Sequence, residues 1–439
     1  MKTKYTLMFL LAVLMITDLH TQTANQNYIQ TRTYTKDDGS TYLEAIQYFD
    51  GLGRPVQVVQ KTVTQLTADL VTYQEYDPFG RKERTWLPVV AAGNNGAYMP
   101  LDTYKAKAMT TYNSTTYNTV ADSVAYSRPV YEASPLNRIL EQYGTGVDWK
   151  TSKKAVRTGY LTNIAKSGTM WTDSDSLVCG LYKTTDETKT ISLSRTANYG
   201  AGELYVTRLK DENDNVSYEF KDKQGQVVLT RQINAGKLYD TNYIYDSFGN
   251  LRAVLPPEAS DRIVSSSNWT EADTNLKLYA YLYKYDERNR CIAKKLPGCE
   301  WVYYVYDKAD QVIYSQDGEL RSKGQWLFSI PDEWNRIVLT GLSNDTISIS
   351  NKVVKGVYAS TGSYKRYNIQ VDGVVKIFTK TPNILSVNYY DNYDFRGMAE
   401  IPFTGTEYTV ETDYGIWYGK DYTEDNKYKN KGRSEEHTS

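Results

Sequence analysis

The stretch most suggestive of chemistry is a run of oxygen-bearing side chains at residues 211–215 (DENDN), with Asp222 in the twelfth position counted from Asp211. Calcium-binding loops place carboxylate and amide oxygens at alternate positions of such a segment. Here Val216 stands where the loop needs glycine, and Asp222 stands where it needs a bidentate glutamate. Two successive backbone turns explain the same residues, so no metal site is predicted.

Residues for acid–base or nucleophilic catalysis are scarce. The only histidines are His20 and His437, and both lie in terminal segments that we do not expect in the mature protein. Ser-His-Asp and Cys-His catalysis and histidine metal sites are therefore not expected. A glycosidase needs two carboxylates across a sugar site, but the conspicuous acidic residues lie in turn motifs. We predict no catalytic residue, no cofactor and no enzymatic activity.

Aromatic residues are abundant, with 41 Tyr and 8 Trp in 439 residues. Aromatic rings stack on sugars, but the sequence does not separate that role from core packing. The tryptophans considered for glycan binding are Trp149, Trp171, Trp301, Trp326 and Trp417.

Three cysteines remain, Cys179, Cys291 and Cys299. An oxidising compartment would permit one disulfide. A tight hairpin centred on residues 297–298 would place Cys291 opposite about Tyr304, too far from Cys299 to bond. We therefore expect buried free thiols.

The residues that recur most regularly have a backbone role. In eight segments that we interpret as turns, an Asp is followed three residues later by Gly, Asn or Asp, and then usually by Arg, Asn or Gln. Asp opens a type I turn because its carboxylate accepts hydrogen bonds from backbone N–H groups. The fourth residue must take positive φ, as in a three-residue hairpin loop, and Gly, Asn and Asp tolerate it best. The predicted structural positions are Asp50, Gly53 and Arg54; Asp77, Gly80 and Arg81; Asp222 and Gly225; Asp246 and Gly249; Asp286 and Asn289; Asp307 and Asp310; and Asp332 and Asn335. Residues 210–215 form a looser copy with Asp214 in the fourth position, and residues 131–138 (YEASPLNR) look like an enlarged one.

Strand-like sequence flanks these turns. YQEY, YIY, YLYKY and VYYVY precede them, and PVQVV, QVVLT, QVIYS and RIVLT follow. Such β-branched and aromatic runs suit half-buried strands, where Tyr packs its ring and keeps its hydroxyl in water. The pattern predicts a mainly β fold, an elongated antiparallel sheet of β-hairpins, curved or spiralling, with few short helices.

The two ends of the chain carry separate signals. Lys2 and Lys4 precede an apolar stretch ending at Ile16, which predicts a secretory signal peptide cleaved after Ala24. No later stretch is long and apolar enough for a transmembrane helix. One codon choice for residues 433–439 (RSEEHTS) resembles the start of a sequencing-library adapter, so we expect the natural protein to continue beyond Gly432.

These signals divide the chain into five segments. The expected organisation is a signal peptide (1–24), an N-terminal β-rich region (25–204), repeats (205–340), a further β-rich region (341–432) and an artefactual tail (433–439). A short helix is expected at residues 101–109, and a helical insertion at residues 256–274.

The YDxxGR-type turns resemble the YD repeats of RHS proteins, which are large secreted bacterial proteins. Residues 203–341, with YDSFGN, YDERNR and YDKADQ, carry the resemblance best, and it spans about residues 28–400. YFDGLGRPVQ resembles the region that precedes such repeats in one exported subgroup. The resemblance implies a β-walled cocoon around a C-terminal toxin released by self-cleavage. The chain departs from this pattern because it lacks the RHS core, its autoproteolytic aspartates and a toxin domain.

The sequence therefore predicts a non-enzymatic scaffold, the N-terminal part of a larger RHS-type protein, secreted or held at the bacterial cell surface. It would display or enclose a C-terminal effector or toxin domain of the same polypeptide, absent here. Surface glycans or the secretion machinery are further expected partners. With a net charge of −1, nucleic acid is not an expected partner. The alternative is a cell-surface adhesin that binds glycans through Tyr- and Trp-rich sheet faces.

Overall fold

The computed structural model describes residues 25–390, apart from residues 37–38, 65–66, 114–121, 167–175, 186–189, 264–267 and 360. The expected signal peptide and the expected artefactual tail lie outside these residues. The described part is mainly β, with antiparallel strand pairs and a few short helices, which confirms the predicted fold class. No helix in this part is long and apolar enough to cross a membrane.

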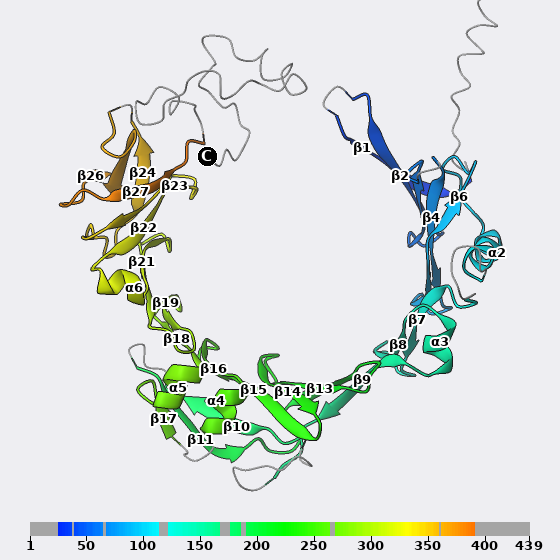
Figure 1. The fold of residues 1–439 in the computed structure, drawn as a ribbon, viewed down its shortest axis with the longest axis horizontal. Coiled ribbons are helices and arrows are strands. Elements are labelled where there is room, and N and C mark those ends of the chain that lie inside the picture. Colours follow the sequence, from blue (N-terminus) through cyan, green and yellow to red (C-terminus); the bar gives the residue numbers. More distant parts are fainter. Residues whose placement is uncertain are drawn as a thin grey trace, which may run out of the picture. The chain divides into compact units, whose positions relative to one another are not determined.

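The chain divides into two compact units, whose helices and strands are labelled in Figure 1. One comprises Met1–Tyr160 and Thr207–Ser217, and the other comprises Leu161–Val206 and Tyr218–Ser439. Strands β9 (Ala155–Thr162), β12 (Tyr205–Lys210) and β13 (Val216–Lys221) cross the boundaries between them.

The first unit is an antiparallel meander. Each strand pairs with the next, except that β4 pairs with both β5 and β6 and β5 pairs with β7. Its elements are β1 (Asn27–Tyr34), β2 (Tyr42–Phe49), β3 (Pro55–Lys61), β4 (Asp69–Tyr76), β5 (Lys82–Trp86), β6 (Val89–Ala91), α2 (Leu101–Tyr112), β7 (Tyr126–Tyr131), β8 (Ile139–Tyr143) and α3 (Val147–Thr151). The predicted helix at residues 101–109 is confirmed and continues to Tyr112.

One face of this meander forms a core. The alternation of buried and half-buried residues along β2, β3 and β4 directs Ile46, Val59 and Val71 to the same cluster. Helix α2 covers that cluster with Tyr104, whose hydroxyl donates to the carbonyl oxygens of Val71 at 3.0 Å and Leu87 at 2.7 Å.

The second unit contains a longer meander with two smaller sheets packed on it. The meander runs β14 (Val227–Asn234), β15 (Lys237–Tyr245), β16 (Leu251–Leu255), β18 (Tyr281–Tyr285), β19 (Cys291–Lys295), β20 (Val302–Tyr306), β21 (Val312–Gln316), β22 (Trp326–Pro331), β23 (Ile337–Ser343) and β27 (Asn383–Val387). The small sheets are β10 (Gly180–Thr184), β11 (Ser192–Asn198) and β17 (Asn268–Thr270), and β24 (Val354–Tyr358), β25 (Tyr367–Val371) and β26 (Val374–Lys376). The helices are α4 (Pro257–Arg262), α5 (Thr274–Tyr279) and α6 (Gly318–Ser322). The predicted helical insertion is therefore confirmed.

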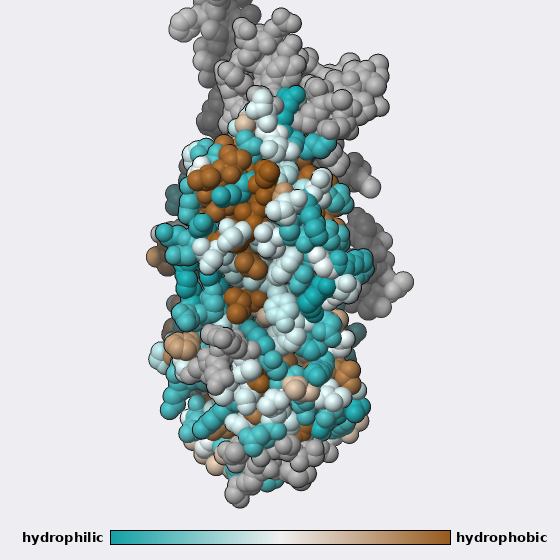
Figure 2. All heavy atoms as spheres, turned by 90° about the vertical axis from the view of Figure 1, so that its left-hand side faces the viewer, coloured by the Kyte–Doolittle hydropathy of each residue, from teal (hydrophilic) through white to brown (hydrophobic). Residues whose placement is uncertain are grey.

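Each small sheet seals a separate core. Leu193 and Trp269 of the first small sheet cluster with Ile244 and Leu255 of the meander. The second small sheet contributes to a cluster that also contains Phe328. Figure 2 shows the side of the molecule that lies at the left in Figure 1, and apolar side chains gather on its upper part. The large apolar residues exposed between β24 and β27 are Val357, Val374, Val375, Ile377 and Leu385.

A buried ion pair fastens the first small sheet to the meander. Arg231 on β14 is fully buried and donates from Nε and Nη2 to the two carboxylate oxygens of Asp240 on β15, both at 2.7 Å. Its Nη1 also donates to the carbonyl oxygens of Ser176 and Val178, each at 2.9 Å, in the segment leading to β10. Charge-assisted bonds to both layers therefore fix their separation.

Candidate functional site

The eight repeated turns share one backbone geometry. In each, the Asp Oδ1 accepts hydrogen bonds from the N–H groups of the third and fifth residues, as Asp77 does from Phe79 and Arg81, both at 2.9 Å. The Asp N–H donates to the carbonyl of the fifth residue, and the fourth N–H donates back to the Asp carbonyl. The fourth residues all have positive φ: Gly53 76°, Gly80 80°, Asp214 68°, Gly225 84°, Gly249 81°, Asn289 59°, Asp310 63° and Asn335 62°.

The fifth side chain completes most of these turns. An Arg there donates from Nε to the Asp Oδ2 at 2.7 Å in the turns opened by Asp50, Asp77, Asp286 and Asp332. Asn215 and Asn250 use their amide nitrogens in the same way, at 2.7 Å and 3.2 Å. The pKa of Asp50 is lowered, first by the hydrogen bond from the Arg54 N–H. The pKa values of Asp77, Asp211 and Asp286 are lowered as well, so these carboxylates are held charged by the turns they close.

The segment 131–138 forms an enlarged version of this turn. Glu132 takes the place of Asp, two residues are added, and Asn137 carries the positive φ, 54°. Arg138 donates from Nε to both carboxylate oxygens of Glu132 at 2.9 Å. The side-chain bond from Arg138 is the main reason that the pKa of Glu132 falls to about 2. The longer acid spans the larger loop and keeps the same pairing.

A second set of contacts links seven of the turns to a tyrosine further along the chain, and sequence reasoning missed it. A tyrosine hydroxyl donates to the carbonyl of the residue that follows the fifth position of the previous turn, at 2.9–3.4 Å. Five of these tyrosines directly precede the first residue of the next turn. The pairs are Tyr76–Pro55, Tyr131–Lys82, Tyr160–Ile139, Tyr245–Val227, Tyr285–Leu251, Tyr306–Cys291 and Tyr390–Ile337.

Where the fifth residue is Arg, its guanidinium also lies over the ring of that tyrosine. The distances from Arg Cζ to the ring centre are 4.3–4.8 Å. The pairs are Arg54–Tyr76, Arg81–Tyr131, Arg138–Tyr160, Arg290–Tyr306 and Arg336–Tyr390. We call the combined tyrosine hydrogen bonds and arginine stacks the turn ladder. It occurs within both units and explains why Tyr precedes Asp in the motif.

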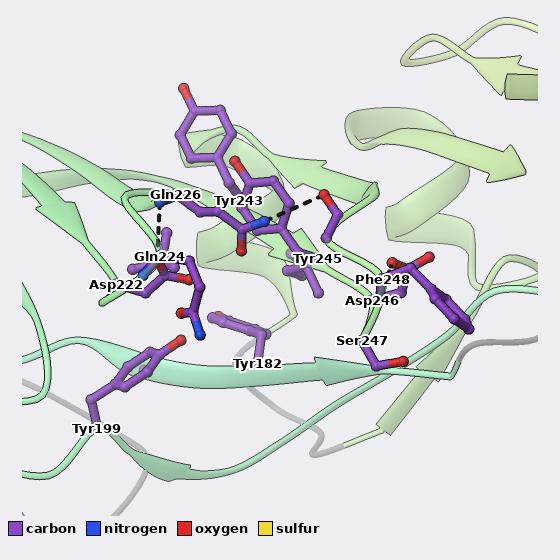
Figure 3. A pocket seen from close by; sticks show the side chains of 14 residues that line it. Tyr182, Tyr199, Asp222, Gln224, Gln226, Tyr243, Tyr245, Asp246, Ser247 and Phe248 are labelled. Atoms are coloured by element: carbon purple, nitrogen blue, oxygen red, sulfur yellow. Dashed lines mark hydrogen bonds between the residues drawn. The ribbon is translucent and has the colours of Figure 1, made fainter. Parts of the chain in front are cut away.

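A polar cavity lies beside the turn ladder in the second unit (Figure 3). It has a volume of about 510 Å³ and lies between β10, the end of β11 and the turns opened by Asp222 and Asp246. Tyr182 and Tyr199 line the wall that belongs to the small sheet. Burial raises the pKa of both phenols, so they remain neutral donors and acceptors at physiological pH.

The residues considered for other chemistry take different places. Trp301 and Trp326 are half-buried and pack against hydrophobic clusters, Trp149 is 44% exposed, and Trp171 and Trp417 lie outside the described residues. The most exposed tryptophan of the described part is Trp334, at 71%. It holds the third position of its turn, where a side chain projects outward, and this position was the signal available in the sequence.

The three cysteines differ in burial, and residues 211–215 form a backbone turn. Cys179 is buried and Cys291 is half-buried, but Cys299 is exposed. The expectation of buried thiols is therefore wrong for Cys299, which closes an exposed turn by donating its N–H to the Leu296 carbonyl at 3.1 Å. Asp211 and Asp222 each close their own turn, on either side of β13. Within the described residues, no cluster of three or more His, Cys, Asp or Glu side chains is arranged to hold a metal.

Comparisons with known proteins give one family match and several similar solved structures. Residues 20–162 match a family described as a domain of unknown function, DUF6443. No curated protein matches the chain. Similar solved structures include TcdB2-TccC3-TEV (13% identity, TM-score 0.47, 76% of this chain and 14% of that chain) and TcdB2-TccC3 (12%, 0.43, 77% and 15%). A Photorhabdus luminescens Tc holotoxin pore is also similar (12%, 0.44, 76% and 14%). The chain thus spans about a seventh of the length of these structures. The fold and the turn ladder themselves define a β scaffold built from repeats.

Proposed function

We propose that the chain is a non-enzymatic, exported scaffold of RHS type, whose hairpins form a wall that displays or encloses another domain of the same polypeptide. The observation that carries this proposal is the turn ladder. The same tyrosine and arginine contacts recur from turn to turn in both units. An architecture of repeated neighbour contacts extends hairpin by hairpin and needs no reactive centre.

The charges of the turns support a structural role for the acidic residues. Arg54, Arg81, Arg290 and Arg336 pair with the aspartates of their own turns. A carboxylate whose pKa is lowered in this way is not poised as a general acid, because a general acid needs a pKa raised toward neutral pH. The lowered pKa values of Asp50, Asp77 and Glu132 agree with that role.

Glycan binding by sheet faces remains a prediction without a specific contact in its favour. Two of the three described candidate tryptophans, Trp301 and Trp326, pack against hydrophobic clusters. A half-buried ring offers a sugar less surface than an open platform does.

The scaffold proposal is tested by limited trypsin digestion of the protein expressed from the uninterrupted natural gene. Residues 25–390 should survive as a resistant body. A downstream domain that is enclosed should be cut more slowly in the whole protein than alone, whereas a displayed domain should be cut at the same rate. Cleavage throughout residues 25–390 at the rate of an unfolded chain would contradict the proposal. Secretion of the mature protein starting at Asn25 would support export.

A further inference from the structure

In the turn ladder, each arginine guanidinium contacts a carboxylate and an aromatic ring. In the turns of Asp50, Asp77, Glu132, Asp286 and Asp332, a guanidinium bonds the acid of its own turn. It also lies over the ring of the ladder tyrosine, at 4.3–4.8 Å. Carboxylate pairing and ring stacking both suit this planar cation better than an ammonium.

The turn opened by Asp222 has the same carboxylate and the same tyrosine, but no arginine. Its fifth residue is Gln226, whose Nε2 donates to the Gly249 carbonyl at 3.4 Å rather than to Asp222. Asp222 Oδ1 accepts from two backbone N–H groups, whereas Oδ2 has no hydrogen bond or ion pair within the described residues. The ladder bond persists, because the Tyr245 hydroxyl donates to the Val227 carbonyl at 3.1 Å. No cation from the described part lies over the Tyr245 ring.

The cavity of about 510 Å³ lies at this place and is lined by Asp222, Gln226 and Tyr245. Figure 3 shows these side chains together with Tyr182 and Tyr199 on the facing wall. The volume suffices for a guanidinium and its alkyl stem.

The other turns without a fifth arginine are completed by their own neighbours. Asn250 donates from Nδ2 to Asp246 Oδ2 at 3.2 Å, and Asn215 does the same for Asp211 at 2.7 Å. In the turn with Gln311, Asp307 Oδ2 accepts from the Val354 N–H at 3.0 Å. Among the eight described aspartates that open turns, only Asp222 has a carboxylate oxygen without a hydrogen bond or ion pair in the described part, and Asp222 lines a cavity.

The other charged groups at the cavity, Arg195 and Asp246, have partners other than Asp222. Arg195 lies behind Gly180 on the small-sheet wall, where its Nη2 donates to Asn198 Oδ1 at 3.1 Å and its Nη1 to the Tyr182 hydroxyl at 3.5 Å. Its described contacts do not include Asp222. The second acid, Asp246, is bonded to Asn250 and to Arg252.

We propose that this cavity binds an alkylguanidinium group, such as an arginine side chain, with Asp222 Oδ2 as the carboxylate acceptor and the Tyr245 ring as the stacking surface. In this site the ligand would supply the guanidinium group. In other turns, the arginine at the fifth position supplies it. This binding is separate from the scaffold role, because the turn ladder is already continuous here through Tyr245.

The test is calorimetric titration of the full chain with L-argininamide, and with n-butylammonium as the control of equal charge. We expect saturable binding of L-argininamide and at least about tenfold weaker binding of n-butylammonium. Gln226→Arg should reduce binding at least about tenfold by placing the repeat's own guanidinium in the cavity, and it should not lower Tm. Asn215→Arg makes the same change in an exposed turn of the other unit and should leave binding unaltered.

The source of the guanidinium is distinguished with the peptide acetyl-Gly-Arg-Gly-amide. Tighter binding of this peptide than of L-argininamide would identify arginine within a polypeptide as the ligand, and the reverse would identify a small molecule. Absence of saturable binding to either probe by the folded chain would overturn the proposal. Equal binding by Gln226→Arg and the natural sequence would also overturn it.

Discussion

The hydroxyl of Tyr76 donates a hydrogen bond to the carbonyl oxygen of Pro55 at 2.9 Å, across two consecutive turns of the first unit. Arg54, just before Pro55, lies 4.5 Å from the centre of the Tyr76 ring. Each contact joins residues that are local to different hairpins. The Tyr and Arg of the repeat motif therefore connect two neighbouring turns, whereas the Asp acts within one turn.

Removing the Tyr76 hydroxyl should weaken this link. Tyr76→Phe loses one partly exposed hydrogen bond, and we expect the free energy of unfolding to fall by about 0.5–1.5 kcal/mol. Urea denaturation measures this as a lower midpoint with an unchanged slope. Tyr28→Phe removes a hydroxyl from the exposed strand β1 and is the matched control. Equal stability of the two variants would count against the ladder.

The two glycines of the first turn should respond differently to the same change. Gly53 has a φ of 76° and Gly51 does not have a positive φ, while a Cβ at either position meets no atom within 4 Å. Gly53→Ala should cost about 1–2 kcal/mol because of left-handed strain, whereas Gly51→Ala should be neutral or slightly stabilising. Thermal denaturation of both variants checks this. Similar losses from both would show that the turn does not require positive φ.

Acid should weaken the enlarged turn. The pKa of Glu132 is about 2 in the folded protein, against an ordinary 4.5, chiefly because of the Arg138 side chain. A folded-state pKa below the unfolded value stabilises the protein above the unfolded pKa, and this contribution is lost as pH falls through the folded pKa. The Tm difference between the natural protein and Glu132→Gln should therefore shrink from about pH 5 to pH 2. A difference that stays constant over this range would contradict the pairing.

The buried ion pair of the second unit should tolerate joint replacement better than single replacement. Arg231→Met leaves the Asp240 carboxylate buried without its guanidinium, and we expect a loss of about 3–5 kcal/mol. Arg231→Met combined with Asp240→Leu removes both charges and should recover part of that loss. Recovery should be incomplete, because the carbonyls of Ser176 and Val178 lose their donor. Chemical denaturation gives both values, and a double variant less stable than Arg231→Met would refute this reasoning.

What the sequence could predict was local in the chain. Positive φ at Asn289 and Asp310 follows from residue type and position within one turn. The helix predicted at residues 101–109 also followed from a local pattern, although the structure extends it to Tyr112. These features depend on residues within a few positions of each other, so no knowledge of pairing is needed.

What the sequence could not predict depended on the next turn. The role of Tyr285 requires knowing that its partner is Leu251, and the hydroxyl cannot be assigned until β16 is placed beside β18. Gln226 holds the position that arginine holds in other turns. The sequence alone does not show what this difference means, because the place of the guanidinium is known only from the structure of those turns. The sequence also contains a further copy of the motif, YDFRG, at residues 393–397. It lies outside the described residues.

The most direct test of coupling between turns is a double-mutant cycle on Arg54 and Tyr76, with the variants Arg54→Leu, Tyr76→Leu and the double variant. The ladder predicts a coupling free energy of about 0.5–1 kcal/mol from the cation–π contact. The energy of the bond between Arg54 and Asp50 cancels in the cycle, because that bond is lost equally in Arg54→Leu and in the double variant. Additive losses, with a coupling energy indistinguishable from zero, would contradict the claim that consecutive turns stabilise one another.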